Sequence, residues 1–253
     1  MSGLTPLLSP SATGGRADEV VRRITEAIHL GLLSDGERLP AEAELAAQFG
    51  VAPMTMRDAL ALLRDEGLLV TKRGRHGGSF VQRPQSPPLE RLRLRLAGMT
   101  LAGIRDLVDE HAAIAGHTAK LAAERAAAPN VRRLFTLTEQ LGSAANVGDR
   151  IRADCRFHIE LAVASQSQRL TRREVALQAE SSGMLWLPSD AGDSAPDLNA
   201  DVETLVAEHH AIASAVVAED AEKARKLAEA HVAGNLRRLT DHHLHLTQKE
   251  DRA

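Results

Sequence analysis

Four residues in the second half of the chain have types and spacings that could bind a metal ion. Asp154 and His158 are four residues apart, which places both side chains on one face of a helix. His209 and His231 lie on either side of an expected turn at Asp220, each about 16 Å from it at the rise of an α-helix. In an antiparallel helical hairpin these two side chains reach the same level. Three imidazoles and one carboxylate that converge inside a bundle can bind a divalent transition metal and leave positions open for water or a small anion.

The sequence predicts the four ligand residues more closely than it predicts which ion they bind. Zinc is the ion we expect, while nickel and manganese could accept the same four residues. The competing interpretation is that these are ordinary surface histidines, because the chain contains eleven histidines in all.

Other residues near this set are weaker candidates. His210 points about 100° away from His209 on a helix and is expected to face solvent. Cys155 is expected to pack in the core, and Trp186 either lines the site or closes that core. The histidines near the end of the chain, at positions 242, 243 and 245, are expected to have no designed role.

The elements that carry the four candidate ligands are long helices. The sequence predicts helices over residues 100–127, 131–144, 149–165, 170–186, 201–218 and 221–245, all within usual helix lengths. A loop rich in Gly, Pro, Asp and Ser is expected over 188–199. The second half of the chain is therefore predicted to be an all-α bundle of roughly six helices.

The first half of the chain has a pattern that predicts a winged helix-turn-helix. Residues 40–49 form a short amphipathic helix, and Gly50 can adopt the left-handed conformation of a sharp turn. A second helix starts at Pro53, whose missing N–H costs nothing at the first helical position. Two short strands, over 68–72 and 79–82, follow around a loop rich in Gly and Arg.

The charge on this unit predicts binding to double-stranded DNA. Residues 57–83 carry six Lys and Arg side chains against three Asp and Glu side chains. The first residues of a recognition helix meet base edges in the major groove, and Arg57 there could contact a phosphate or pair with a guanine edge. The competing interpretation is a helical hairpin with a solvated basic face. The residues expected to contact DNA are Arg38, Pro53, Met54, Thr55, Arg57, Arg73, Arg75, His76 and Gly77.

Length and composition agree with two domains in one chain. A chain of 253 residues can hold two separate cores, and a hydrophobic content of 43% is typical of a soluble globular protein. The net charge is −3, so attraction to DNA must come from the local basic patch. A single cysteine excludes an internal disulfide framework and suits a reducing cytoplasm. No apolar run approaches the length of a membrane span.

Five segments are expected along the chain. They are a disordered arm over 1–15, the winged helix-turn-helix over 16–83 with its first helix at 16–32, a linker over 84–99, the bundle over 100–246 and a tail over 247–253. Residues 84–88 are Pro-rich, which is typical of a linker. Residues 89–96 alternate apolar and arginine side chains, so they are either a short connecting helix or an exposed basic segment near the DNA.

The pattern over residues 38–81 resembles the DNA-binding domain of the GntR family of bacterial transcription regulators. The family motif Leu-Pro-x-Glu-x-Glu-Leu stands at 39–45, Arg-x-Ala-Leu at 57–60, Glu-Gly-Leu at 66–68 and Gly-x-Phe-Val at 78–81. Ala43 stands where many relatives have an arginine that touches DNA, and Pro53 replaces another arginine or serine. The resemblance implies DNA binding, at an operator that differs from the commonest one in the family.

Residues 100–245 resemble the ligand-binding FCD domain of FadR-type GntR regulators. Metal-binding members show Asp-x-x-x-His, then Glu-His-x-x-Ile and a later His, which match residues 154–158, 208–212 and 231 here. The resemblance implies that Asp154, His158, His209 and His231 are metal ligands. His111 stands where relatives usually have an arginine that helps to hold an effector carboxylate, and Ser167 where they often have asparagine, so these two are the expected effector-binding residues.

Two classes of function remain. The first is a DNA-binding transcription regulator that acts as a homodimer on a pseudo-palindrome, with a bundle that senses a small organic acid at the metal. The second is a metal-dependent hydrolase or lyase fused to a DNA-binding domain, which needs a general acid or base beside the metal. Glu208 is adjacent in sequence but is expected to point off the ligand face, so no residue fills that role and we favour the regulator. The sequence does not decide between repression and activation.

Overall fold

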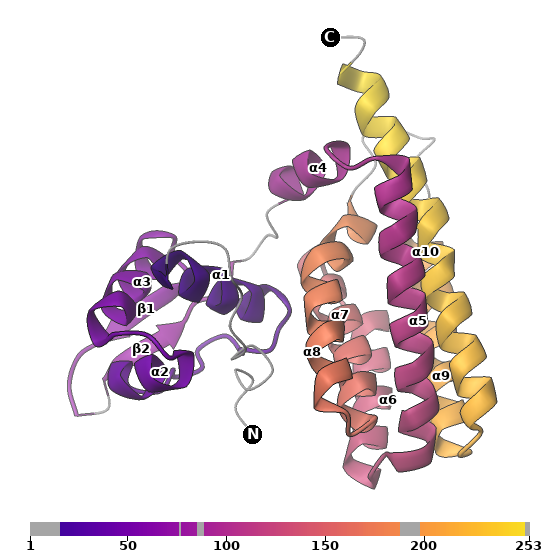
Figure 1. The fold of residues 1–253 in the computed structure, drawn as a ribbon, viewed down its shortest axis with the longest axis horizontal. Coiled ribbons are helices and arrows are strands. Elements are labelled where there is room, and N and C mark those ends of the chain that lie inside the picture. Colours follow the sequence, from indigo (N-terminus) through magenta and orange to yellow (C-terminus); the bar gives the residue numbers. More distant parts are fainter. Residues whose placement is uncertain (1–15, 76, 85–88, 188–197, 251–253) are drawn as a thin grey trace. The chain divides into compact units, whose positions relative to one another are not determined.

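The computed structural model describes residues 16–75, 77–84, 89–187 and 198–250, and it divides into two compact units, Met1–Gln85 and Ser86–Ala253 (Figure 1). The first unit is a winged helix-turn-helix with a two-stranded wing, and the second is an all-α bundle. The arm predicted over 1–15, residues 85–88 of the Pro-rich stretch and residues 188–197 of the predicted loop lie outside the described residues. Of the helices in the described ranges, none combines the length and apolar character needed to cross a membrane.

Three helices and a hairpin make up the described part of the first unit. Helices α1 (Arg16–His29), α2 (Glu42–Phe49) and α3 (Pro53–Asp65) precede strands β1 (Leu69–Lys72) and β2 (Gly78–Val81). The strands are antiparallel, with Leu69 opposite Val81. The core between the helices is aliphatic and includes Val20, Ile24, Ile28, Leu45, Met56, Leu60 and Leu63.

The turn between α2 and α3 depends on Gly50. Its φ of 65° lies in the left-handed region, and its N–H bonds back to the carbonyls of Ala46 and Ala47 at the end of α2. Helix α3 then begins at Pro53 as predicted. Helix α1 ends three residues before the predicted position 32, because the chain turns at Gly31, whose φ is 69°.

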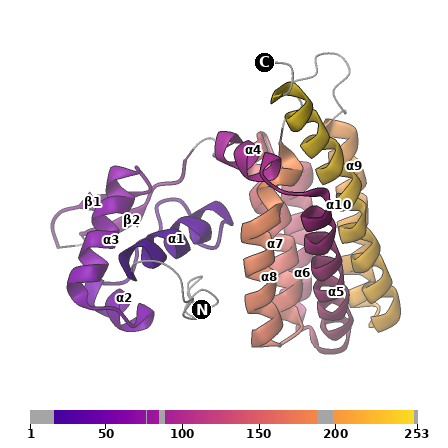
Figure 2. The ribbon, with the colours of Figure 1, turned by 45° about the horizontal axis from the view of Figure 1, so that its top comes forward.

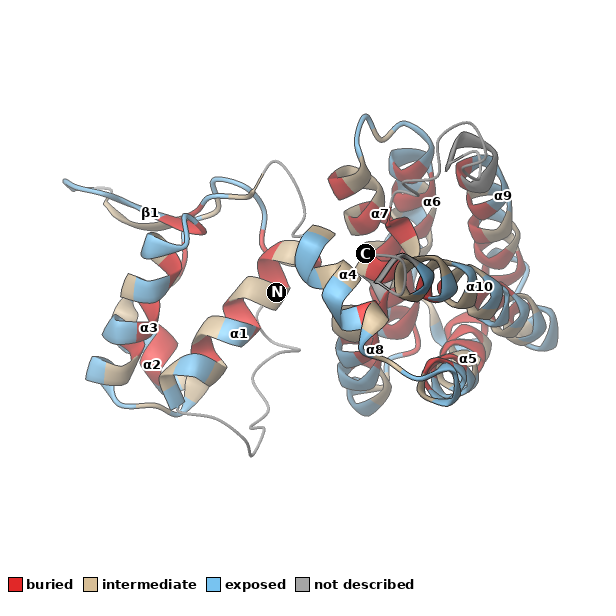
Figure 3. Ribbon diagram, turned by 90° about the horizontal axis from the view of Figure 1, so that it is seen from above, coloured by how far each residue is buried: buried red, intermediate tan, exposed pale blue. Residues whose placement is uncertain are grey.

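The second unit contains seven α-helices and one 3-10 helix within the described residues. They are α4 (Leu89–Ala97), α5 (Leu101–Arg125), α6 (Ala128–Gly142), α7 (Val147–Ala164), α8 (Gln168–Ser181), η2 (Ser182–Trp186), α9 (Leu198–Val217) and α10 (Ala221–Glu250). Helix α10 runs alongside α5 and α9, and α7 packs against α5, α6 and α8 (Figures 1 and 2). Viewed along the bundle, the buried faces of these helices point toward its interior and the exposed faces point outward (Figure 3).

Polar side chains cap the first turns of two of the ligand-bearing helices, α7 and α10. Asn146 Oδ1 accepts the N–H of Asp149 at 2.9 Å and caps α7, while Asp220 Oδ1 accepts the N–H of Lys223 at 3.0 Å at the start of α10. The chain turns between α9 and α10 at Glu219, whose φ is 55°. The antiparallel hairpin predicted around Asp220 is therefore present.

Two predicted helices have boundaries that differ clearly from the structure, and one stretch with two interpretations is now assigned. The helix predicted over 170–186 ends as an α-helix at Ser181 and tightens into η2, where Gly183 packs so closely on Leu92 of α4 that a Cβ would lie 2.7 Å from its Cδ1. Helix α6 begins at Ala128, with Pro129 in its first turn, and not at 131. Residues 89–97 form helix α4, whose Leu96 is fully buried, so of the two alternatives for this stretch the helix is the one observed.

Candidate metal centre

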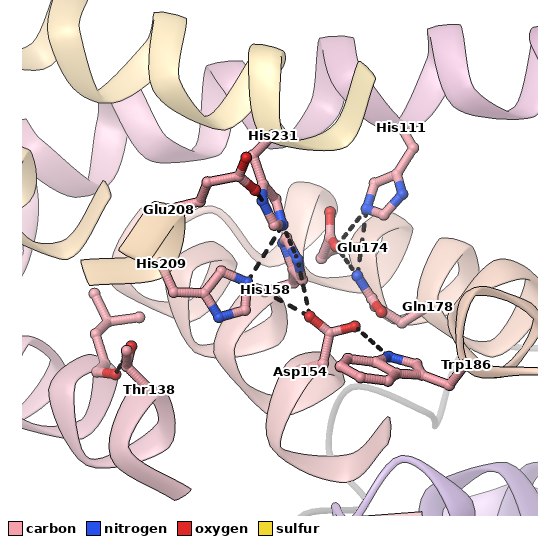
Figure 4. Close-up of polar contacts among 11 residues, drawn as sticks. His111, Thr138, Asp154, His158, Glu174, Gln178, Trp186, Glu208, His209 and His231 are labelled. Atoms are coloured by element: carbon pink, nitrogen blue, oxygen red, sulfur yellow. Dashed lines mark hydrogen bonds and ion pairs between the residues drawn. The ribbon is translucent and has the colours of Figure 1, made fainter. Parts of the chain in front are cut away.

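The side chains of Asp154, His158, His209 and His231 converge in the interior of the second unit (Figure 4). Asp154 Oδ1 lies 3.7 Å from His158 Nε2 and 3.5 Å from His209 Nε2. His231 Nε2 lies 3.2 Å from His158 Nε2 and 3.3 Å from His209 Nε2. All four residues are buried, and one ligand atom from each lies within 4.8 Å of the others. Helix α7 supplies two of them, and α9 and α10 supply one each.

These four ligand atoms fit a metal ion in both number and spacing. A regular tetrahedron with edges of 3.2–3.7 Å has its centre about 2.0–2.3 Å from each corner, close to zinc–nitrogen and zinc–oxygen bond lengths. The separations not given individually are at most 4.8 Å. Three imidazole nitrogens directed at one buried point are typical of a metal site.

Two neighbouring side chains orient the ligands from outside the set. Glu208 Oε2 accepts a hydrogen bond from His231 Nδ1 at 2.7 Å, which leaves the lone pair of Nε2 facing the centre. Trp186 Nε1 donates to Asp154 Oδ2 at 3.1 Å and leaves Oδ1 for the centre. Glu208 lies outside the ligand set, but its flexible stem reaches across to His231 on α10, a contact that the sequence did not predict. Trp186 contacts the ligand set directly and is also buried against the core.

The protonation of the buried ligands also suits metal binding. Burial lowers the pKa of His158 and of His209 well below the usual range, and a proton on the neighbouring His231 would lower both further. Both rings are therefore held neutral, the form that binds a metal. Burial raises the pKa of Asp154, although His231 and the hydrogen bond from Trp186 oppose this. A divalent cation at the centre would stabilise the ionised carboxylate.

A second buried cluster lies beside the four ligands. His111 on α5 places Nε2 2.9 Å from Glu174 Oε1 on α8, and Gln178 Nε2 donates to the same oxygen at 2.8 Å (Figure 4). The His111 ring is 5.8 Å from the His158 ring, centroid to centroid, so the predicted effector residue His111 is next to the metal ligands. Sequence reasoning missed Glu174 and Gln178. The signal was a polar stripe at helical spacing on α8, since Thr171, Glu174, Gln178 and Ser181 are all buried.

The other predicted residues of this unit lie elsewhere. Ser167 makes its described hydrogen bonds at the junction of α7 and α8, where its Oγ accepts the N–H of Leu170 at 3.5 Å. Its role in effector binding stays a prediction. His210 is exposed, as its direction on the helix predicts, and Cys155 is buried, as expected.

In the first unit, most of the predicted DNA-contacting residues that the structure describes are exposed. Pro53, Met54 and Arg57 at the start of α3 are exposed, and Thr55 is half-buried. Arg57 Nε lies 3.4 Å from Glu42 Oε2 on α2, an exposed pair that phosphate could replace. A groove of about 620 Å³ beside them is lined by side chains that include Arg38, Arg64 and Arg73. Arg75 is exposed and Gly77 half-buried, while His76 lies outside the described residues.

Comparison with known proteins adds two family matches. Residues 16–81 match the model of the gntR family of bacterial regulatory proteins, and residues 106–234 match the FCD domain. A Mycobacterium gastri protein described as the HTH-type transcriptional regulator RmpR is 43% identical over 237 residues, 94% of this chain and 85% of its own length. An Escherichia coli protein named as a regulatory protein of the L-lactate dehydrogenase operon is 30% identical over 85% of this chain and 83% of its own length. Among solved structures, a GntR-type regulator from Rhodococcus sp. RHA1 is 19% identical, with a TM-score of 0.49 over 89% of this chain and 98% of that one.

Proposed function

The chain belongs to the gntR family of bacterial regulatory proteins and is a DNA-binding transcription regulator with an FCD domain, and we propose what that domain binds. We propose that the helical unit binds one divalent transition metal and a small carboxylate effector, and that the effector modulates operator binding. The observation that carries this proposal is the convergence of Asp154, His158, His209 and His231 at separations that suit a metal. Zinc is the ion we expect first, with nickel and manganese as alternatives.

The charge of the site supports an anionic effector. One carboxylate and three neutral imidazoles leave a divalent ion with net positive charge in a buried place, where an anion is strongly favoured. When bound, the metal would supply a positive centre with open positions for a carboxylate. The name of the Escherichia coli relative refers to an operon for the oxidation of a small organic acid, L-lactate, which is compatible with an effector of this class.

The helices that carry the ligands supply the means of regulation. Asp154 and His158 lie on α7, His209 on α9 and His231 on α10, so a metal with its effector at the centre would be held by three helices at once. A shift of these helices on effector binding would change how the chain presents its recognition helix α3 to DNA. Coupling of this kind is typically worth about 1–3 kcal/mol, which is a five- to 150-fold change in operator affinity.

We test the metal with a double variant and a matched control. His209→Ala with His231→Ala removes two ligands, and His210→Ala removes an exposed histidine next to His209. Elemental analysis should find about one metal ion per chain in the wild type and in His210→Ala, and almost none in the double variant. Operator duplexes selected from random DNA should bind to all three proteins, but organic acids should change the affinity only of the two that hold metal. An effector response that survives in a folded, metal-free double variant would refute the sensing role.

We further propose that the regulator is a homodimer that reads two half-sites of a pseudo-palindrome. One winged helix-turn-helix alone buries too little surface for tight and specific binding. Sedimentation of the complex with selected operator DNA should show two chains per duplex. One chain bound to one half-site at saturation would contradict this assembly.

A further inference from the structure

A buried carboxylate oxygen beside the metal ligands has no hydrogen-bond partner among the described residues. Glu174 is 1% exposed, and its Oε1 accepts from Gln178 and faces His111. Its Oε2 has no partner. An ionised oxygen that is buried without a donor costs free energy, so an unpaired oxygen of this kind indicates that another molecule supplies the donor.

Glu174 can only accept a hydrogen bond at this oxygen. Burial alone would raise its pKa, but the charge of His111 and the hydrogen bonds around it outweigh burial and lower the pKa of Glu174 to about 2. The same contact raises the pKa of His111 against its own burial. The two side chains therefore form a buried ion pair with no net charge, in place of the single cation that the resemblance leads one to expect at position 111.

Glu174 is close enough to the metal ligands for one small molecule to reach both. His158 belongs to both clusters, and its ligand atom lies within 4.8 Å of those of His111 and Glu174. A few covalent bonds span such a distance. A ligand with its carboxylate at the centre formed by Asp154 and the three histidines can thus place a donor group on the next carbon, or one beyond it, at Glu174.

We propose that Glu174 Oε2 is the specificity-determining acceptor of the effector site, and that it takes a hydrogen bond from the hydroxyl group of a small hydroxycarboxylate. This inference rests on the proposed metal and carboxylate site and names the class of effector. His111 and Gln178 act as positioning residues, because they hold Glu174 Oε1 and so aim Oε2.

Charge balance favours a hydroxyl group over an ammonium group. A divalent ion, Asp154 and the effector carboxylate sum to zero, and so do His111 and Glu174. Outside the ligand set, the negative charge of Glu208 beside His231 is offset by the positive charge of the nearby Arg238. An ammonium group would leave one buried positive charge uncompensated, whereas a hydroxyl group leaves none. A second metal ion at His111, His158 and Glu174 is disfavoured for a related reason, since His158 Nε2 already faces Asp154 and His231 in the first set.

The test compares ligands that differ only in the donor group. Calorimetry on the metal-loaded full-length protein would use lactate, 2-fluoropropanoate and alanine, and the four-carbon series malate, fluorosuccinate and aspartate. Fluorine resembles a hydroxyl group in size but donates no hydrogen bond. In the series that binds, the hydroxy acid should bind about ten- to 100-fold more tightly than its fluoro analogue, and the amino acid should bind more weakly than the hydroxy acid.

Two variants separate this inference from the proposed function. Glu174→Met should keep one metal ion per chain and bring the preference for hydroxyl over fluorine to within about twofold. Glu180→Met, which replaces a half-exposed glutamate on the same helix, should keep both the metal and the preference. If Glu174→Met does not fold, the ligand comparison in the wild type decides alone.

Four results would overturn the inference. Equal binding of the hydroxy and fluoro acids, or tightest binding of the amino acid, would refute the role of Glu174 while leaving the metal site intact. Two metal ions per chain, with one lost in Glu174→Met, would show a second metal site in its place. Failure of every acid in both series to bind the metal-loaded protein would refute the carboxylate effector, and the inference with it.

Discussion

Replacement of Glu208 by alanine should weaken metal binding about tenfold. Glu208 Oε2 accepts a hydrogen bond of 2.7 Å from His231 Nδ1, and this contact is the main reason why the pKa of Glu208 is lowered. The carboxylate fixes which ring nitrogen of His231 carries the proton and raises the basicity of the other. Loss of such an outer partner typically costs ten- to 100-fold in metal affinity. Because the Glu208 side chain is 43% exposed, water can replace part of the contact, so we expect the lower end, about 1.4 kcal/mol.

Competition between the metal-free protein and a chelating zinc indicator measures this loss. Glu208→Gln keeps an acceptor oxygen without the charge, so its affinity should lie between those of the wild type and Glu208→Ala. Glu203→Ala is the matched control, since Glu203 is an exposed glutamate on the same helix. The reasoning fails if Glu208→Ala binds zinc as tightly as Glu203→Ala does.

Three further changes test the first unit. Arg57→Ala should lower operator affinity by about 1–3 kcal/mol if Arg57 pairs with a base. If Arg57 contacts phosphate, the variant should instead bind DNA of every sequence more weakly by a similar factor, and its affinity should depend less steeply on salt concentration. Unchanged binding would contradict the assignment of α3 as the recognition helix. Gly50→Ala should destabilise this unit by about 1 kcal/mol in denaturant titrations, because a φ of 65° is strained for alanine. The added Cβ itself would meet open space, so no steric clash contributes. An unchanged unfolding midpoint would contradict this prediction. Burial alone would raise the pKa of Glu19, but hydrogen bonds from Arg22 and Arg23 more than offset burial and lower it. The ionised Glu19 therefore stabilises the folded state above its ordinary pKa of 4.5, and this stabilisation is lost as the pH falls through the lowered pKa. Glu19→Gln should therefore lower the local stability of α1 at pH 7 by about 0.5 kcal/mol and so speed its amide hydrogen exchange. The difference in exchange between the variant and the wild type should fade below pH 4.5. A difference that stays constant with pH would refute the charge-based account.

Helical geometry predicted two pairs among the candidate ligands, and the resemblance to metal-binding FCD domains predicted that the two pairs form one ligand set. Asp154 and His158 share a face because they are four residues apart, and His209 and His231 meet because they are equally distant from the turn at Asp220. The helix-turn-helix was equally predictable, since Gly50 permits one backbone conformation that other residues rarely adopt. These features are local or depend on a single turn, so they can be predicted from the sequence.

Contacts between distant helices were harder to predict. The direction of Cβ places Glu208 about 100° from His209, but its side chain has enough length to reach His231 on the next helix. The buried pair of His111 and Glu174 joins residues 63 positions apart, and no periodicity relates α5 to α8. Polar residues recur at helical spacing on α8, but only the packed structure shows that they are buried and which residues they face.

Helix α10 connects the candidate metal centre with the helix that follows directly on residues 85–88. It carries His231 at the centre and, twelve residues later, His243, whose buried Nδ1 donates to the carbonyl of Leu96 on α4 at 3.0 Å. The adjacent His242 Nδ1 donates at 3.2 Å to the carbonyl of Met184 in η2, the element that also carries Trp186 to Asp154. These histidines, for which no designed role was expected, thus tie α10 to α4 and to the support of a ligand on α7. Asp154 and His231 are thus both linked through hydrogen bonds to the end of the unit where α4 lies, so a displacement of one relative to the other would strain these contacts as well.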